Sequence, residues 1–367
     1  MAVNTILLDL TVDPQKILEK NGLKSAVQDV LSKFIPELKE VYTSDFQGGG
    51  TLYTFTAVRD SFITVRAFTK GVISINIEYY REDGDEPLLS FETIRQLEEN
   101  LTKQTKSTRS HKYPALTRGG NIDKYFLTAD ERLIEYDIDA VVFEEQSPYQ
   151  KVQIFHTKSF GNMLVLDENQ NMSEQDLIYT ETLMQRGKED YAGKEIVILG
   201  GGDGALLYEL LKEKPKFVTM LELDEVVIRA CREHMRGCCG DILDQLEGLN
   251  YKVVIDDCIK SLDKMITEGK QVDYVFGDLT EIPVSTCAQG ELWDFLRLIL
   301  NKAFQVLRPS GKFMSHGDAA CRPASLALYE NELRNLPCSV EFAKDKAFIP
   351  SFLEDWVFYQ VWLRKRE

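Results

Sequence analysis

The sequence predicts an α/β protein that ends in a Rossmann-like parallel sheet, preceded by a small antiparallel β module and an N-terminal α+β domain. Two observations carry this prediction. From Glu174 onward, apolar β-branched runs alternate with helical patterns, as the strands and helices of a parallel sheet do. Before that point, β-rich runs are separated mostly by short polar turns, which favours antiparallel pairing.

Residues 1–105 form the predicted N-terminal domain. Thr5–Val12 has a strand pattern, and Asp13-Pro14 opens a helix. Three β-rich runs follow between residues 51 and 80, and a helix over Phe91–Thr105 closes the domain. No catalytic group of residues is evident here. The sheet needs cover for its edge, either from a loop or from a second copy of the chain.

Residues 106–117 are polar and basic and include a proline, so we interpret them as a linker. Residues 118–173 return to a β pattern and form the predicted small module. Residues 174–367 form the predicted catalytic domain. The expected strands of the module, and the expected last buried strand of the chain, are Leu133–Phe143, Val152–His156, Met163–Leu166 and Trp356–Trp362.

A glycine-rich loop containing an aspartate follows the first strand of the catalytic domain. Gly200, Gly201, Gly202 and Gly204 surround Asp203. Such a loop normally directs backbone amides at a phosphate, and a carboxylate there competes with that anion. The sequence therefore favours a cationic ligand, such as a sulfonium nucleoside or an amine, and a methyltransferase-like fold.

The next three strand patterns also end in acids. Glu222 lies roughly 20 residues beyond the loop, where folds of this kind place an acceptor for ribose hydroxyls. Asp257 and Cys258 follow the third strand and suit the adenine edge. Asp278 follows the fourth strand. We expect these groups to lie together at the carboxyl edge of the sheet.

Composition limits the classes of partner. With 59 acidic and 43 basic residues, the formal charge is -16 and the pI about 4.9. Nucleic acid and anionic membranes are therefore poor partners, and polycations are favoured. No long apolar run and no signal peptide is evident, and the seven cysteines suit a reducing compartment, so we expect a cytoplasmic protein. Scattered histidines and cysteines predict no metal site.

A series of short motifs runs along the chain: RGG (Arg118–Gly120), EYDID (Glu135–Asp139), SPYQ (Ser147–Gln150), FGNMLVLD (Phe160–Asp167), GKEDYAGK (Gly187–Lys194), LGGGDGA (Leu199–Ala205), LELD (Leu221–Asp224), DDC (Asp256–Cys258), GDLT (Gly277–Thr280), WDFLRLIL (Trp293–Leu300) and PSFLEDWVFY (Pro350–Tyr359). In these motifs the chain resembles the aminopropyltransferases, and most closely the animal spermine synthases. The resemblance covers nearly the whole chain. It includes residues 1–105, which resemble the decarboxylase-like dimerisation domain of those enzymes and imply a homodimer.

The resemblance implies transfer of the aminopropyl group of decarboxylated S-adenosylmethionine to spermidine, giving spermine and methylthioadenosine. The donor is a co-substrate, and no cofactor or metal is implied. The implied nucleoside-binding residues are Gln150, Glu222, Asp257 and Cys258; the implied polyamine-binding residues are Tyr179, Asp203, Phe352 and Glu354. Asp278 is the implied proton acceptor. Since a carboxylate stabilises a neighbouring ammonium, we expect Asp278 to orient the amine as well as accept its proton.

Two positions depart from the family pattern. Phe352 stands where spermine synthases usually carry a tyrosine, and losing one hydrogen bond there weakens acceptor binding by about 0.5 to 1.5 kcal/mol. Glu281 stands where spermidine synthases tend to carry a second aspartate. Spermidine synthase and thermospermine synthase therefore remain alternatives. An inactive regulatory paralogue that binds polyamine or nucleoside is an alternative of another class, as is a methyltransferase that uses ordinary S-adenosylmethionine.

Overall fold

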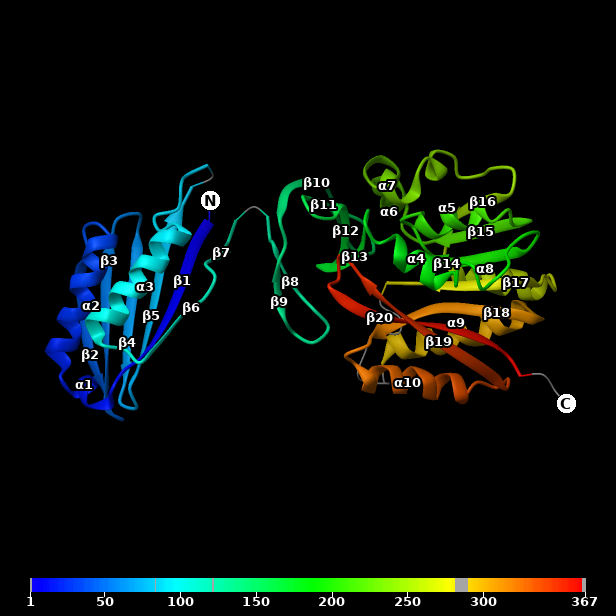
Figure 1. Ribbon diagram of the computed structural model, residues 1–367. Helices are drawn as coiled ribbons and strands as arrows, with labels where there is room; N and C mark the ends of the chain where they lie inside the picture. Colours follow the sequence, from blue (N-terminus) through cyan, green and yellow to red (C-terminus); the bar gives the residue numbers. More distant parts are fainter. Residues whose placement is uncertain (1, 83, 121, 281–289, 365–367) are drawn as a thin grey trace. The chain divides into compact units, whose positions relative to one another are not determined.

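A computed structural model describes residues 2–82, 84–120, 122–280 and 290–364 (Figure 1). The chain divides into two compact units, Met1–Asp123 and Lys124–Glu367. Each unit has its own sheets and its own apolar core.

The first unit is an antiparallel sheet covered on one face by helices (Figure 1). Its strands pair in the order β2-β3-β4-β5-β1-β6, and β7 also pairs with β1. The elements are β1 (Ala2–Thr11), α1 (Pro14–Leu18), α2 (Lys20–Phe34), β2 (Lys39–Phe46), β3 (Gly50–Ala57), β4 (Ser61–Phe68), β5 (Val72–Arg81), α3 (Phe91–Thr105), β6 (Arg109–Lys112) and β7 (Leu116–Arg118). Strand residues such as Ile63 and Ile75 alternate toward the helices and pack with Leu31 and Leu97.

The prediction that residues 106–117 are a linker is wrong. Strands β6 and β7 lie within or at the end of this segment and pair with β1, so the segment belongs to the N-terminal sheet. Its polar composition fits that position, because β6 is a short strand at the sheet edge whose residues stay partly or fully exposed. Strand β2 was not predicted, since most of its residues are exposed and show no apolar alternation.

The second unit begins with two small antiparallel sheets. They pair β8 with β9, and β10, β11, β12 and β13 in sequence. Their bounds are β8 (Tyr125–Leu127), β9 (Leu133–Glu135), β10 (Ile138–Gln146), β11 (Lys151–Thr157), β12 (Gly161–Leu166) and β13 (Asn169–Ser173). The single strand expected over Leu133–Phe143 is therefore two strands in different sheets. Tyr136 follows the first of them; its side chain is buried, and its hydroxyl donates to the Ser351 carbonyl.

The largest sheet of the second unit has the strand order β16-β15-β14-β17-β18-β20-β19. The strands from β16 through β15, β14 and β17 to β18 are parallel to one another. Strand β20 is antiparallel to both of its neighbours, β18 and β19. The elements are α4 (Leu177–Leu183), β14 (Glu195–Gly200), α5 (Ala205–Lys212), β15 (Phe217–Glu222), α6 (Glu225–His234), α7 (Arg236–Cys239), the 3-10 helix η1 (Ile242–Asp244), β16 (Tyr251–Ile255), α8 (Cys258–Thr267), β17 (Val272–Asp278), α9 (Glu291–Val306), β18 (Leu307–Ala319), α10 (Pro323–Arg334), β19 (Val340–Ile349) and β20 (Glu354–Leu363). The predicted Rossmann-like, methyltransferase-type fold class is confirmed.

Apolar helix faces cover both sides of this sheet. Ile198 of β14 packs in one core with Leu206 of α5, and the next residue, Leu199, packs in the other core with Leu262 of α8 and Leu300 of α9. This alternation is what a strand buried on both faces requires. Within the described residues, no helix is both long enough and apolar enough to span a bilayer.

Candidate active site

The glycine loop after β14 lies directly against the end of β17. Gly200 has a φ of 82°, and a Cβ there would stand 2.2 Å from the Asp278 carbonyl oxygen. The Gly201 amide donates to that same oxygen at 3.1 Å. Because the two strand ends touch at a position that only glycine permits, the loop aspartate and the β17 aspartate belong to one site.

Asp203 sits at the start of α5. Its Oδ1 accepts a hydrogen bond from the Ala205 amide at 2.7 Å. Burial nevertheless raises the pKa of the Asp203 carboxyl. The sequence prediction placed a carboxylate in this loop, and burial of that group disfavours its charged form.

Asp278 ends β17 and is paired with Tyr179 of α4. The Tyr179 hydroxyl donates to the Asp278 carboxyl, and both groups lie in the low-dielectric interior of the site. Burial raises the pKa of Asp278 well above its ordinary value, and the charges of Asp203 and Glu222 raise it further. The same burial raises the pKa of Tyr179, which keeps the hydroxyl protonated as a donor.

Glu222 ends β15 on the other side of the loop. Its Oε1 accepts from the Asp224 amide at 2.9 Å. A Cβ on Gly202 would lie only 2.7 Å from its Oε2. Burial raises the pKa of Glu222 to about 7. Glu222, Asp203 and Asp278 thus form a cluster of carboxyls whose pKa values burial raises, and a cationic ligand would stabilise their charged forms.

These acids are not arranged for a metal ion. Across the part of the chain that the structure describes, no group of three or more histidine, cysteine, aspartate or glutamate side chains could hold one. The prediction that the protein uses no metal is not tested by this observation and stays a prediction.

The predicted nucleoside residues occupy the ends of β15 and β16 and a neighbouring turn. Asp257 accepts from the Ile259 amide at 2.9 Å and caps α8, and Cys258 is buried at the first position of that helix. Gln150 reaches the same edge from the turn between β10 and β11, and its Nε2 donates to Asp224 Oδ2 at 3.0 Å.

Sequence reasoning missed two apolar residues at this edge. Leu223 and Ile255 are 43% and 37% exposed although both follow or end buried strands. They flank the acids of β15 and β16 and offer apolar contact for a flat ring. Their position next to Glu222 and Asp256 was a usable signal, because a strand end that carries acids and an exposed aliphatic suits a nucleoside.

The predicted polyamine residues from the end of the chain lie around the start of β20. Glu354 is buried, and its Oε2 accepts from the Ala129 amide at 2.9 Å. Arg132 Nη2 lies 3.9 Å from its Oε1. The Phe352 ring contacts the Tyr179 ring edge to face at 6.3 Å between centroids. Through Tyr179, the structure connects this segment to Asp278.

His316 of β18 is another residue that the sequence did not reveal. It is buried, its Nε2 lies 2.8 Å from the Leu279 carbonyl oxygen, and its ring lies 6.2 Å from the Tyr179 ring. No sequence signal marked it, since a lone histidine in a strand is usually a core residue. Glu281, whose effect on acceptor choice was predicted, lies outside the described residues.

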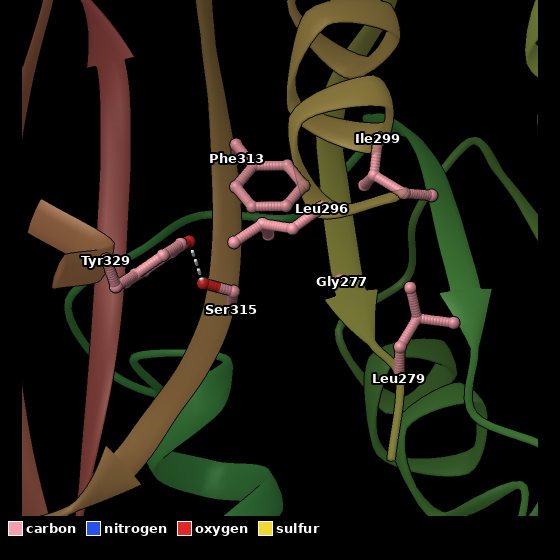
Figure 2. Close-up of a pocket in the computed structure, with 7 residues that line it drawn as sticks. All are labelled: Gly277, Leu279, Leu296, Ile299, Phe313, Ser315 and Tyr329. Atoms are coloured by element: carbon pink, nitrogen blue, oxygen red, sulfur yellow. Dashed lines mark hydrogen bonds between the residues drawn. The ribbon is translucent and has the colours of Figure 1, made fainter. Parts of the chain in front are cut away.

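A small cavity lies at the end of β17, beside residues of α9, β18 and α10 (Figure 2). Its lining residues are Gly277, Leu279, Leu296, Ile299, Phe313, Ser315 and Tyr329. Ser315 and Tyr329 bond each other through their hydroxyls at 2.8 Å. At about 10 Å³, the cavity is close to the space that one water molecule needs, so it is not a substrate site.

Comparison of the sequence with models of known protein families identifies the family of this chain. The family model "Spermine/spermidine synthase domain" matches residues 176–367, which is more than half of the chain. The chain belongs to the spermine/spermidine synthase family. A second family model, "Spermidine synthase tetramerisation domain", matches residues 125–174, the region of β8 to β13.

Curated relatives of this spermine/spermidine synthase family member are polyamine aminopropyltransferases. That of Aeropyrum pernix is 28% identical over 240 residues, which are 64% of this chain and 72% of that protein. That of Shigella boydii serotype 4 is 29% identical over 187 residues, which are 49% of this chain and 60% of that protein. The prediction that the chain is a member of the aminopropyltransferases is confirmed.

Solved structures share the fold. The spermidine synthase of Thermotoga maritima aligns with a TM-score of 0.53 at 18% identity, covering 66% of this chain and 79% of that one. A spermidine synthase in complex with the transition state analogue AdoDATO aligns with a TM-score of 0.54 at 18% identity, covering 66% and 80%.

Proposed function

We propose that the protein is a spermine synthase. It transfers the aminopropyl group of decarboxylated S-adenosylmethionine to spermidine and yields spermine and methylthioadenosine. The observation that carries the proposal is the group of Asp203, Glu222 and Asp278 at the carboxyl edge of the sheet, with Tyr179 bonded to Asp278. Such a group of acids favours a ligand with several positive charges, and both proposed substrates are cationic.

The proposed reaction is a direct displacement. The spermidine nitrogen forms a bond to the propyl carbon attached to sulfur, the carbon–sulfur bond breaks, and its electron pair neutralises the sulfonium. The attacking amine loses a proton to Asp278. Because burial and like charges raise the pKa of Asp278, this carboxyl is a stronger base than an exposed aspartate, which supports the assigned role.

The assigned roles divide the two substrates between two parts of the site. Gln150, Glu222, Asp257 and Cys258 hold the nucleoside of the donor. Tyr179, Asp203, Phe352 and Glu354 hold the polyamine. The reaction needs no further cofactor or metal, because the sulfonium is itself the activated leaving group.

The choice of spermidine as acceptor is supported by the resemblance of residues 1–105 to the dimerisation domain of animal spermine synthases. Residues 1–124 lie outside both family models that match the chain. Phe352 adds an apolar ring where that group usually has a hydroxyl, so we expect weaker acceptor binding without a change of reaction.

The experiment that tests the function is product analysis by mass spectrometry. The full chain is incubated with decarboxylated S-adenosylmethionine and equal amounts of putrescine and spermidine, and Asp278→Asn serves as the inactive control. Spermine with methylthioadenosine is the expected result. Spermidine made from putrescine would instead identify a spermidine synthase, and thermospermine a thermospermine synthase. Methylthioadenosine binding without any transfer would instead favour a regulatory paralogue.

We also propose a cytoplasmic homodimer formed through the first unit. The face of its sheet opposite the helices exposes Phe62, Phe68 and Val72, which are 45%, 37% and 38% exposed. Arg66 lies between them, with its guanidinium 4.4 Å from the Phe68 ring centroid. Aromatic and aliphatic side chains on an otherwise polar face are typical of a surface that a second copy covers.

A further inference from the structure

Asp224 is a buried acid that the assigned roles leave unused. It lies two residues after Glu222, is 2% exposed, and begins α6 as its N-cap. Its Oδ1 accepts from the Val226 amide at 3.0 Å, which is all that a helix cap requires. The second oxygen, Oδ2, turns to a segment more than 70 residues away, where it accepts from the Ser147 hydroxyl at 2.7 Å and from Gln150 Nε2 at 3.0 Å.

The segment that Asp224 holds is the tight turn between β10 and β11. Ser147 Oγ accepts from the Tyr149 and Gln150 amides at 3.1 and 3.0 Å, and the Ser147 amide donates to the Gln150 carbonyl at 2.9 Å. With its lone pairs occupied by these amides, the Ser147 hydroxyl has its own hydrogen free for Asp224. The turn is therefore closed on itself and fastened to the β15 edge by one carboxylate.

This contact fixes which way the Gln150 amide points. A side-chain amide has one accepting oxygen and one donating nitrogen, and every contact of the Asp224 carboxylate is with a donor. The nitrogen of Gln150 must therefore face Asp224. Within the described residues no hydrogen bond engages Gln150 Oε1, so this acceptor is available to a ligand.

The same residue also fixes Glu222. The Asp224 backbone amide donates to Glu222 Oε1 at 2.9 Å, so one residue orients two acceptors at the edge of the sheet, one through its side chain and one through its backbone. Both acceptors suit hydroxyl or amino donors, which a ribose or an aminopropyl nucleoside supplies.

We propose that Asp224 is a positioning residue for the donor nucleoside. It holds Gln150 with its oxygen toward the ligand, beside the carboxylate of Glu222. The inference rests on the proposed function, since it concerns the same nucleoside site, but it assigns to Asp224 a role separate from capping α6.

The test starts from Asp224→Asn. Asparagine keeps an oxygen for the Val226 amide, but its Nδ2 then faces the Gln150 nitrogen, and two donors cannot bond each other. Gln150 must turn over and present its NH₂ to the nucleoside. We expect the Kd for methylthioadenosine, measured by calorimetry on the full chain, to rise about tenfold while the KM for spermidine changes little.

The decisive variant is Asp224→Asn combined with Gln150→Glu. The asparagine nitrogen then donates to the new carboxylate, whose second oxygen faces the ligand as an acceptor. The donor and the acceptor of the pair thus change places, while the total charge of the two side chains stays the same. We expect this double variant to recover most of the lost affinity, whereas Gln150→Glu alone sets two carboxylates against each other and binds poorly. The coupling between the two sites is read from the double-mutant cycle.

Two further variants separate positioning from folding. Asp224→Ser keeps a capping oxygen for α6 but is too short to reach Gln150 or Ser147, so we expect the chain to stay folded with a modestly lower melting temperature and weakened nucleoside binding. Asp244→Asn removes a carboxylate from an exposed pair with Arg236 and should bind as the wild type does.

Wild-type affinity in Asp224→Asn, or a double variant that binds no better than Asp224→Asn, overturns the positioning role. If instead the wild-type chain neither binds methylthioadenosine nor transfers an aminopropyl group, the proposed function fails as well. The two failures are thus told apart by the wild type alone.

Discussion

Asp278 is stabilised as a carboxylate by one neutral donor and opposed by two acids. The hydroxyl of Tyr179 lowers its pKa, whereas burial, Asp203 and Glu222 raise it. A bound polyamine adds positive charge beside all of them. Its binding therefore releases protons from the site, and acceptor affinity increases with pH until the amines themselves lose charge.

Tyr179→Phe isolates the neutral donor. Losing the hydroxyl removes a bond that favours the charged carboxylate, so the pKa of Asp278 rises further and the acid limb of the pH profile of kcat/KM moves to higher pH. We expect kcat to fall about tenfold at neutral pH from the loss of one charge-assisted hydrogen bond. Initial rates between pH 6 and 9 measure this shift. An acid limb at the same pH in both proteins would contradict the claim that the Tyr179 hydroxyl lowers the pKa of Asp278.

Glu222→Gln tests the raised pKa through stability. Burial moves the pKa of Glu222 from 4.5 to about 7, so between these values the folded chain binds more protons than the unfolded chain. The unliganded protein therefore loses stability as pH rises through this window, and the glutamine variant loses less. Urea unfolding at pH 5 and pH 7.5 compares the two, and equal changes for both proteins would contradict the shift.

Among the elements, the loop from β14 to α5 does the most to assemble the site. Gly200 lets the loop touch β17, and Gly202 leaves room for the Glu222 carboxylate. The contact of Gly200 with β17 occurs at the point where the strand order reverses between β14 and β17, which is where open α/β sheets bind ligands.

Gly202→Ala tests that packing. The three atoms nearest to the added Cβ all belong to the Glu222 side chain, with Oε2 at 2.7 Å, so the carboxylate must move. We expect about tenfold weaker methylthioadenosine binding with little loss of stability. Gly22→Ala in α2 is the matched control, because a Cβ there meets nothing within 4 Å and should stabilise the helix slightly. Equal nucleoside affinity in both variants would contradict the view that Gly202 positions Glu222 for nucleoside binding.

Elements with strong local signals were predictable. The runs ending at Gly200, Glu222 and Asp278 combine β-branched residues with a turn or an acid, so their strands and their common edge follow from sequence. The strands β6 and β7 were not, because their pairing with β1 joins residues about 100 positions apart and their side chains are polar. Asp224 and Ser147 were missed for the same reason, since each looks like an ordinary cap or turn residue until its distant partner is known.

For the whole molecule, the open face of the first unit is the proposed dimer surface. Phe68 and Val72 are cross-strand partners on β4 and β5. Phe68→Lys with Val72→Glu replaces them by an oppositely charged pair that suits the sheet but not an apolar interface. We expect light scattering of the full-length variant to report a monomer.

The control uses a second exposed cross-strand pair. Leu127 and Leu133 face each other on β8 and β9 within the region that matches the tetramerisation model, and are 69% and 53% exposed. Leu127→Lys with Leu133→Glu should leave the dimer intact. A monomer for this second variant and a dimer for the first would indicate that the chain self-associates through the β8–β9 hairpin.

The reversal of strand order between β14 and β17 has a consequence for how such enzymes diversify. On the proposed roles, the ends of β15 and β16 serve the reactive donor, whereas Asp203 in the loop after β14, α4, the end of β17 and the start of β20 serve the acceptor. Substitutions in the second group, as at Phe352, can change the length or shape of the amine accepted while the first group keeps the sulfonium chemistry constant. A lineage can thus acquire new products by altering one half of a sheet and inheriting the other half unchanged.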